Sequence, residues 1–425
     1  NHYPTRGHEE IISMQFNPLS KDTYQENRKK LANSLLPNSM AILHSNDRMP
    51  WSADQYFPFR QNKDLLRLCG IYQEETVLVL YPDHLIDSSR EILFIKKADD
   101  HHKIWDGDVL DKKQAGEISG IKNIQWVDDF EKITYSLIPK ADQVYLNSNE
   151  KGNYPIEVEG RNERLGKKLM SQFPFHKIGR LQPLLKLQTL IKTGEELNQI
   201  RKAIKLTGDT WKYIAPLIKH GVYEYEIAAE ISYQFEKKGA DHAFQPIVAS
   251  GKSACILHYK QNNNIVLQGD LVLVDFGAEL NGYSADMTRC TAANGVMTKR
   301  QFEVYDQVLS IFAEARKLIK PGISIQNLND SLEEICWQSL AQLGLGKKEN
   351  DKKSILKKYI PHGISHFLGM DVHDYGDKHT ILAPGMVITC EPGIYIYEEG
   401  LGIRLENDLL ITQGGNEDLM DGIDM

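Results

Sequence analysis

Several features are scarce in this chain, and each scarcity excludes a class of protein. The 425 residues contain five cysteines and no Cys-x-x-Cys pair, which favours ordinary thiols in a reducing compartment over a disulfide scaffold. No apolar run approaches the roughly 20 residues of a membrane-spanning helix. The net charge is −8 and the basic residues are dispersed, so no nucleic-acid-binding patch is visible. We therefore expect neither a membrane nor a nucleic-acid partner.

The composition is that of an ordinary globular protein. Apolar residues make up 41% of the chain and charged residues 25%, and 425 residues are enough for two domains with a large core. The first ten residues, NHYPTRGHEE, are polar and lack the apolar segment of a secretory signal. From these features we expect a cytoplasmic protein.

The patterning changes at about residue 190. Before it, one amphipathic helix and several strand-like runs alternate, which predicts an α/β domain with a mixed sheet. After it, long helices separated by short strands dominate, and Thr193 with Glu196 forms a possible capping box for the first of them. The expected helices span 23–36, 191–211, 223–238, 299–319 and 325–343, and the expected early strands span 39–45, 76–82, 91–97 and 143–148.

The second part contains a faint internal repeat. The segments LIKHG (217–221) and LIKPG (318–322) each end one helical pattern and precede another. Each unit reads as helix, Leu-Ile-Lys-x-Gly, helix and then strands. Two structurally related halves would produce this sequence repeat, although five-residue repeats also arise by chance in a chain of this length.

Five candidate metal ligands follow one another in four patterned segments. Carboxylates and imidazoles are hard oxygen and nitrogen donors, and such a set suits a pair of divalent cations better than a structural zinc ion. The segments are LVLVDFGAELNGYSADMTR (271–289), HGISHFLGMDVHD (362–374), ITCEPG (388–393) and GIRLEND (402–408), and the candidate ligands are Asp275, Asp286, His366, Glu391 and Glu406.

The first of these segments predicts a hairpin that brings its two acids together. Asn281-Gly282 is a strong signal for a type I′ turn, in which both central residues have positive φ. With that turn, Asp275 lies opposite Thr288, and Asp286 becomes its diagonal neighbour roughly 7–8 Å away. Two cations about 3.5–4 Å apart could bridge that gap. An exposed hairpin with two solvated acids is the alternative interpretation.

The remaining segments favour a site over isolated charges. Glu391 follows an apolar strand and precedes Pro-Gly, so its carboxylate points out of a strand end. Arg404 and Glu406 are two residues apart and share a strand face. They could form a surface pair, or the arginine could support an acid that binds metal. His362, His366 and His373 fall within twelve residues, a stronger signal than a lone histidine.

Taken together, these segments resemble the pita-bread-fold metallopeptidases: aminopeptidase P, prolidase and methionine aminopeptidase. IVASGKSACILHY (247–259) is similar to the stretch that carries a catalytic histidine in that family, here His258. FPFRQNKD (57–64) resembles the N-terminal domain of the aminopeptidase P and prolidase branch. EPGIYI, GIRLEND and GNEDL (415–419) look closer to bacterial aminopeptidase P than to prolidase.

The resemblance implies a fold and a domain division. We predict an α+β chain in which a creatinase-N-like α/β domain with a mixed sheet precedes a pita-bread catalytic domain. The predicted domains are 1–188, for oligomerisation and pocket closure, and 189–425, the metallopeptidase domain. A homodimer or homotetramer is expected.

The resemblance also implies the role of each site residue. Asp286 and Glu406 would bridge the two ions. Asp275 would complete the ligand set of one ion, and His366 with Glu391 would complete that of the other. Glu391 would also accept the proton of the attacking water, and His258 and His373 would stabilise the intermediate and carry the proton to the leaving nitrogen. The implied cofactor is a pair of divalent ions, manganese first, with cobalt or zinc as alternatives. Residues matching positions that line or support the substrate pocket are His362, Tyr395, Arg404 and Trp105.

Trp105 is the least specific of these assignments. It lies in the polar stretch HHKIWDGDVL (101–110), where a single tryptophan is usually a partly buried anchor of its own domain. The stretch also resembles a family segment whose tryptophan projects toward the active site of a neighbouring subunit. The sequence leaves both interpretations open.

The function favoured by these residues is a metal-dependent exopeptidase that removes the N-terminal residue from peptides with proline in second position. Prolidase, which cleaves Xaa-Pro dipeptides, is the alternative. A creatinase-like hydrolase that needs no metal and a non-catalytic pita-bread binding protein are more distant, because the five ligands and the accessory histidines are intact. Methionine aminopeptidase does not need an N-terminal part of roughly 190 residues.

Overall fold

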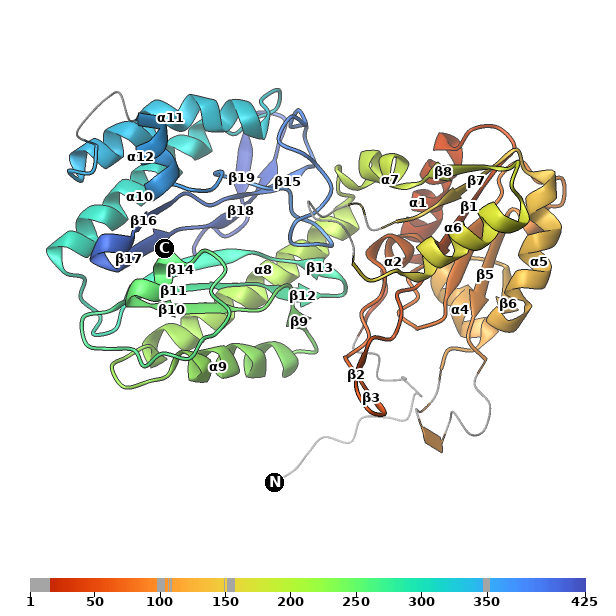
Figure 1. Ribbon diagram of the computed structural model, residues 1–425, viewed down its shortest axis with the longest axis horizontal. Helices are drawn as coiled ribbons and strands as arrows, with labels where there is room; N and C mark the ends of the chain where they lie inside the picture. Colours follow the sequence, from red (N-terminus) through yellow and green to blue (C-terminus); the bar gives the residue numbers. More distant parts are fainter. Residues whose placement is uncertain are drawn as a thin grey trace.

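The structure is a computed structural model that describes residues 16–97, 104–105, 107, 109–148, 150, 157–346 and 352–425. Figure 1 shows two lobes joined side by side. We call the part from helix α1 to helix α7 the N-terminal lobe and the part from α8 to strand β19 the C-terminal lobe. Within the described residues, no helix is long and apolar enough to cross a membrane.

The N-terminal lobe is built on a six-stranded sheet of order β6-β5-β4-β1-β7-β8. Strand β1 pairs antiparallel with β4 and parallel with β7, so the predicted mixed sheet is confirmed. The elements of this lobe are α1 Lys21–Ser34, β1 Ser39–His44, β2 Pro50–Ser52, β3 Gln55–Tyr56, α2 Lys63–Cys69, β4 Val77–Leu80, β5 Glu91–Ile95, α4 Lys112–Ser119, β6 Asn123–Trp126, α5 Phe130–Leu137, β7 Gln143–Leu146, α6 Arg161–Gln172, β8 Lys177–Arg180 and α7 Gln182–Thr189.

Both faces of this sheet are covered, which explains why its central strands are apolar throughout. Ala41 and Leu43 of β1 pack in one core cluster with residues of α1, α2, α4 and α7. Met40 and Ile42 point to the opposite face and pack with residues of α5 and α6. The lobe is therefore a three-layer α/β unit, as the alternation of elements predicted.

His44, at the end of β1, gives this lobe a pH-dependent stability. The ring is 8% exposed, its two nitrogens have no hydrogen-bond partner among the described residues, and it packs edge-on against Phe130. Desolvation, helped by the nearby Arg161, lowers the pKa of His44 from 6.5 to about 3. Below pH 6.5, His44 binds a proton in the unfolded chain but stays neutral in the folded lobe. The free energy of unfolding therefore decreases as the pH falls from 6.5 toward 3.

We expect His44→Leu to remove this loss, because leucine fills a similar volume and does not titrate. Between pH 6.5 and 5 the wild-type chain should lose up to about 2 kcal/mol more unfolding free energy than the variant, since one pKa unit corresponds to about 1.4 kcal/mol. Urea unfolding followed by circular dichroism at pH 7, 6 and 5 measures the difference. Parallel stability curves for the two proteins would contradict the burial of a neutral His44.

The C-terminal lobe consists of several short sheets flanked by helices. The expected helices and the capping box of Thr193 with Glu196 are confirmed. The elements are α8 Gly194–Ile214, α9 Glu224–Glu236, β9 Asp241–His242, β10 Ile247–Ser250, β11 Leu271–Phe276, β12 Ala278–Leu280, β13 Tyr283–Ser284, β14 Met287–Ala292, α10 Lys299–Leu318, α11 Ile325–Gln342, α12 Lys352–Tyr359, β15 Val387–Cys390, β16 Gly393–Ile396, β17 Leu401–Arg404, β18 Asn407–Ile411 and β19 Asn416–Asp418.

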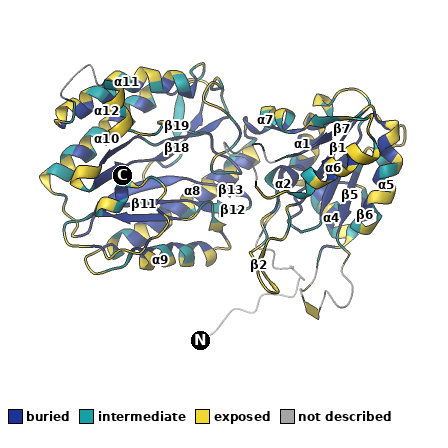
Figure 2. Ribbon diagram, viewed as in Figure 1, coloured by how far each residue is buried: buried dark blue, intermediate teal, exposed yellow. Residues whose placement is uncertain are grey.

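Strand β11 separates the two cores of this lobe, and Figure 2 shows it as buried. Val272, Val274 and Phe276 pack in one cluster with residues of α8 and α9. Leu271 and Leu273 pack on the other face, in a cluster with residues of α10 and α11. Because side chains alternate along a strand, Asp275 shares the face of Leu271 and Leu273.

The internal repeat is confirmed by matching backbone geometry. Gly221 and Gly322 have φ angles of 91° and 92°. Each glycine is followed by an isolated antiparallel bridge, Tyr223 to Ile265 in the first unit and Ser324 to Ile381 in the second. Helices α9 and α11 begin at the residue after each bridge. The two units therefore have the same local architecture.

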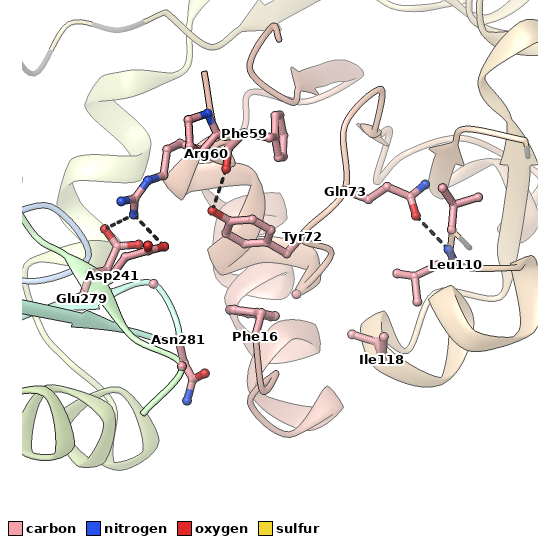
Figure 3. A pocket seen from close by; sticks show the side chains of 15 residues that line it. Phe16, Phe59, Arg60, Tyr72, Gln73, Leu110, Ile118, Asp241, Glu279 and Asn281 are labelled. Atoms are coloured by element: carbon pink, nitrogen blue, oxygen red, sulfur yellow. Dashed lines mark hydrogen bonds and ion pairs between the residues drawn. The ribbon is translucent and has the colours of Figure 1, made fainter. Parts of the chain in front are cut away.

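Polar contacts join the lobes. Arg67 of α2 donates to Glu196 of α8 at 2.8 Å, and both side chains are almost fully buried. Arg60 reaches from the N-terminal lobe to Asp241 and Glu279, at 3.2 and 3.5 Å (Figure 3). The contacts of Arg60 border a cavity of about 410 Å³ at the junction, which is separate from the predicted metal site.

Candidate metal centre

The predicted hairpin places Asp275 and Asp286 beside each other. Asp275 of β11 lies opposite Thr288 of β14, and Asn281 and Gly282 have φ angles of 52° and 83° at the turn, as expected. Between the strands the hairpin passes through Gly277, where a Cβ atom would lie 1.8 Å from the carbonyl oxygen of Ala285. Only glycine fits this approach, and Asp286 directly precedes β14.

His366 enters from the loop that follows α12. Its backbone N–H donates to Thr389 Oγ1 at 3.1 Å, and its carbonyl accepts from the N–H of Thr389 at 2.9 Å. The ring nitrogen Nδ1 lies 3.1 Å from the carbonyl oxygen of Phe367 and donates a hydrogen bond to it. The unprotonated Nε2 therefore has a lone pair with which it can bind a metal ion. Nε2 lies 3.4 Å from Asp286 Oδ2 and 3.3 Å from Glu391 Oε1.

Arg404 and Thr288 hold the remaining acids in place. The guanidinium of Arg404 donates to Asp275, to the Tyr395 hydroxyl at 2.8 Å and to Thr288 Oγ1 at 3.1 Å. Thr288 Oγ1 in turn donates to Glu406 Oε2 at 2.6 Å. The surface-pair interpretation of Arg404 and Glu406 is wrong, because both residues are buried in this network.

The electrostatics of the cluster require compensating positive charge. Burial, and then the charge of Asp275, raise the pKa of Asp286 well above its usual range. Burial, and then Asp286, do the same to the pKa of Glu406. One carboxylate oxygen each of Asp275, Asp286 and Glu406 is buried without a hydrogen-bond partner among the described residues. Such oxygens are expensive to bury unless a cation or a proton satisfies them.

The donor set therefore fits divalent cations. Ligand atoms of Asp286, His366 and Glu406 all lie within 4.8 Å of one another. Glu391 lies beside this group, because its Oε1 is 3.3 Å from His366 Nε2. Asp275 is near enough for its charge to raise the pKa of Asp286. Four carboxylates and one imidazole converge from the four patterned segments. We interpret the cluster as a site for divalent metal ions.

A cleft of about 670 Å³ opens over this cluster. Its lining adds apolar residues, Ile247, Leu257 and Val372, to the charged groups. The predicted site residues that line it are His258, Asp275, Asp286, His362, His366, His373, Glu391, Arg404 and Glu406. Tyr395 lies behind the lining, buried and hydrogen-bonded to Arg404, with its oxygen 2.7 Å from His362 Nε2.

The two histidines expected to act on protons lie at the cleft. The His373 ring lies 4.4 Å from that of His366 and is nearly perpendicular to it. Desolvation, and then the neighbouring His366, lower the pKa of His373 to about 4. His258 is exposed in the lining of the same cleft and is close enough to contribute to that shift. A neutral His373 can accept or relay a proton.

Trp105 is not brought to this cleft within the single chain. Its side chain is 74% exposed, and the cleft lining does not include it. This exposure does not favour the partly buried anchor, and both interpretations of Trp105 stay predictions. The expectation of ordinary thiols is confirmed, because all five cysteines are unpaired.

Three supporting residues escaped the sequence reasoning. Thr288 links Arg404 to Glu406, Thr389 holds His366, and the fully buried Asp408 accepts from the backbone N–H of Asp286 at 3.1 Å. The predicted register had already placed Thr288 opposite Asp275, and Asp408 is two residues beyond Glu406. Strand alternation could therefore have identified Thr288 and Asp408, and also Thr389, which lies two residues before Glu391.

Comparison with known proteins agrees with this geometry. Residues 198–413 match the model of metallopeptidase family M24, and residues 24–145 match the N-terminal domain of aminopeptidase P. The chain is 33% identical to the Xaa-Pro aminopeptidase of Escherichia coli, over 94% of this chain and 95% of the relative. It is 32% identical to human Xaa-Pro aminopeptidase 3, over 88% and 76%.

Solved structures show the same fold. E. coli aminopeptidase P with the inhibitor Pro-Leu superposes with a TM-score of 0.86 at 31% identity, covering 96% of both chains. Proline aminopeptidase P II from Yersinia pestis gives 0.85 at 31% identity, covering 96% of this chain and 97% of that one.

Fold and site thus define a metal-dependent hydrolase with a pita-bread catalytic domain behind an aminopeptidase-P-type N-terminal domain. The chain belongs to metallopeptidase family M24. The fold-class prediction is confirmed.

Proposed function

We propose that this metallopeptidase releases the N-terminal residue from peptides whose second residue is proline. The observation that carries the proposal is the convergence of Asp275, Asp286, His366, Glu391 and Glu406 beneath one cleft, with His258 and His373 at its lining. The relatives named Xaa-Pro aminopeptidase cover nearly the whole chain, which supports the same specificity.

The assignment of ligands follows the family resemblance, and the closeness of Asp286, His366 and Glu406 supports it. Asp286 and Glu406 would contact both cations, Asp275 would complete one and His366 with Glu391 the other. When bound, such a pair supplies a nucleophilic water at neutral pH and polarises the scissile carbonyl. Manganese heads our proposal for the native metal, because carboxylate-rich sites suit it, with cobalt and zinc as alternatives.

The side chains divide the proton transfers among them. Glu391 accepts the proton of the attacking water, and Thr389 Oγ1 donates to Glu391 Oε1 at 3.2 Å, which orients the carboxylate. His258 and His373, at the cleft surface, stabilise the developing oxyanion and deliver a proton to the leaving nitrogen. His362 and Tyr395 support the substrate pocket, and Arg404 fixes Asp275.

We expect the proline nitrogen and the free α-amino group to be required. The free α-amino group of the substrate would lie near one metal and Asp275, which places the first peptide bond at the site. Ala-Pro-Ala should therefore be cut at the Ala-Pro bond. Acetyl-Ala-Pro-Ala should not turn over, and Ala-Ala-Ala should be cut at least 10²-fold more slowly. Mass spectrometry of the products, with manganese, cobalt or zinc added to stripped enzyme, measures each rate.

The same assay separates the alternatives. Turnover confined to the dipeptide Ala-Pro would replace this proposal by prolidase, and efficient release of Met from Met-Ala peptides would overturn the proline requirement. No peptide turnover with any metal would favour a binding protein.

The proposal includes the organisation of the whole protein. We propose that residues 1–188 form the domain for oligomerisation and pocket closure and that 189–425 form the catalytic domain. The exposed Trp105 supports a role between subunits in a homodimer or homotetramer. The unpaired cysteines support a reducing, cytoplasmic location. Sedimentation of the wild type and of Trp105→Ala, with peptidase assays of both, tests the subunit role.

A further inference from the structure

The segment that carries His373 is anchored in the opposite lobe. Tyr375, two residues further on, is 3% exposed and belongs to the hydrophobic core of the N-terminal lobe, together with Leu65 and Leu68 of α2. Its hydroxyl donates to Asp64 Oδ2 at 2.9 Å, and the same oxygen accepts from Asn147 Nδ2 at 2.9 Å. An aromatic ring of the catalytic lobe is thus held as a core residue of the other lobe.

A second anchor lies one residue earlier. Asp374 pairs with Lys192 Nζ at 3.0 Å, and the two side chains are only 3% and 4% exposed. Lys192 Nζ also donates to the carbonyl of Thr189, the last residue of α7, at 2.6 Å. This ion pair ties the segment between α7 and α8, directly after the N-terminal lobe, to the loop that carries His373.

The anchored loop closes on itself below the cleft. The backbone N–H of Asp374 donates to the carbonyl of Phe367 at 3.0 Å. The Asp374 carboxylate lies over Gly369, where a Cβ atom would be 1.9 Å from Asp374 Oδ2. The ring of His373 lies 4.4 Å from that of His366, so a shift in the backbone of this closed loop would change that contact.

We propose that Asp64, Lys192, Asp374 and Tyr375 are positioning residues, through which the N-terminal lobe holds His373 over the metal-binding cleft. The inference rests on the proposed function, because that function assigns the proton transfer to His373. It gives the N-terminal lobe a part in the chemical step, in addition to closing the pocket. Displacing a catalytic group by about 1 Å can cost on the order of 10²-fold in rate.

The competing interpretation is that these buried pairs only stabilise the junction of the lobes. The chain offers a matched control, because Lys63 of α2 pairs with Glu279 of β12 across the same junction, with both side chains at most 15% exposed. That pair involves no residue of the loop 366–376. Glu279→Gln should weaken the junction and leave the loop in place.

The experiment compares Tyr375→Phe, which keeps the buried ring but loses the bond to Asp64, with Glu279→Gln. We expect Tyr375→Phe to lower kcat for Ala-Pro-Ala about tenfold, with KM and metal content within twofold of wild type. Lys192→Met with Asp374→Asn, which replaces the ion pair without leaving a buried charge, should lower kcat similarly. Glu279→Gln should keep kcat within twofold.

The decisive readout is the same substitution in a His373→Ala background. If Tyr375 acts through His373, Tyr375→Phe should change kcat less than twofold there. An equal tenfold loss in both backgrounds, or a similar kcat loss in Glu279→Gln, would show a general structural role and overturn the inference.

Hydrogen exchange gives a test that needs no turnover. Peptides covering 366–376 should exchange faster in Tyr375→Phe than in wild type, whereas Glu279→Gln should leave them unchanged. Unaltered exchange in Tyr375→Phe would overturn the inference even if the proposed function holds. If the wild type fails to cleave Xaa-Pro peptides, the proposed function is refuted. If peptides covering 366–376 still exchange faster in Tyr375→Phe than in that wild type, the anchoring of the loop stands.

Discussion

Asp286→Ala and Glu406→Ala should each lose metal and peptidase activity together while the fold survives. Both side chains are almost fully buried, and each has one oxygen without a hydrogen-bond partner among the described residues. Their ligand atoms and that of His366 lie within 4.8 Å of one another, and we propose that both acids bridge the two cations. Removing either also relieves repulsion between buried carboxylates, so the stability of the metal-free protein should not fall. Elemental analysis after dialysis, with kcat and thermal unfolding, measures all three quantities.

A buried acid outside the cluster provides the control. Glu224 is fully buried in the same lobe, but its oxygens accept from Ser250 and from Tyr259 and Asn264. Glu224→Gln should lower stability and keep the metal content of wild type. Full two-ion occupancy in Asp286→Ala or Glu406→Ala would refute the bridging assignment.

His258→Ala and His373→Ala should lower kcat on the order of 10²–10⁴-fold, the usual scale for a positioned proton-transfer group. Metal content should stay near that of wild type, because both histidines lie at the cleft surface and the ligand cluster does not need them. Steady-state kinetics and elemental analysis of the same preparations separate the two effects.

His379→Ala is the matched control for these variants, since His379 is exposed on the same stretch of chain and does not line the cleft. Its kcat should stay within twofold of wild type. If His373→Ala loses metal along with activity, His373 is a ligand and the division between ligands and proton carriers is wrong.

Local sequence was sufficient for the hairpin and the helices of the C-terminal lobe. Asn281-Gly282 specifies a turn that demands positive φ, and the turn sets the register that puts Asp275 opposite Thr288. Thr193 and Glu196 specify a helix start through short-range hydrogen bonds. Such features depend on neighbours in sequence, so a single chain without relatives was enough to predict them.

The order and chemistry of the candidate ligands were likewise determined by the sequence. Four acids and a histidine in patterned segments indicated a site for hard cations before any fold was known. Alternation along the segment GIRLEND (402–408) predicted a common face for Arg404 and Glu406, and could not decide whether that face was exposed. Burial of the pair depends on strands more than 100 residues away in sequence, including β11 and β14.

Only the tertiary structure decided how these groups act on one another. Arg404 donates hydrogen bonds to Asp275, Tyr395 and Thr288. Tyr375 donates to Asp64, which lies 311 positions away in sequence. No periodicity or turn signal reports contacts at that range. The sequence by itself determined which donors are present and which chain segments carry them. The packing of two lobes determined which donors are buried together, because desolvation and hydrogen-bond geometry are properties of the folded chain.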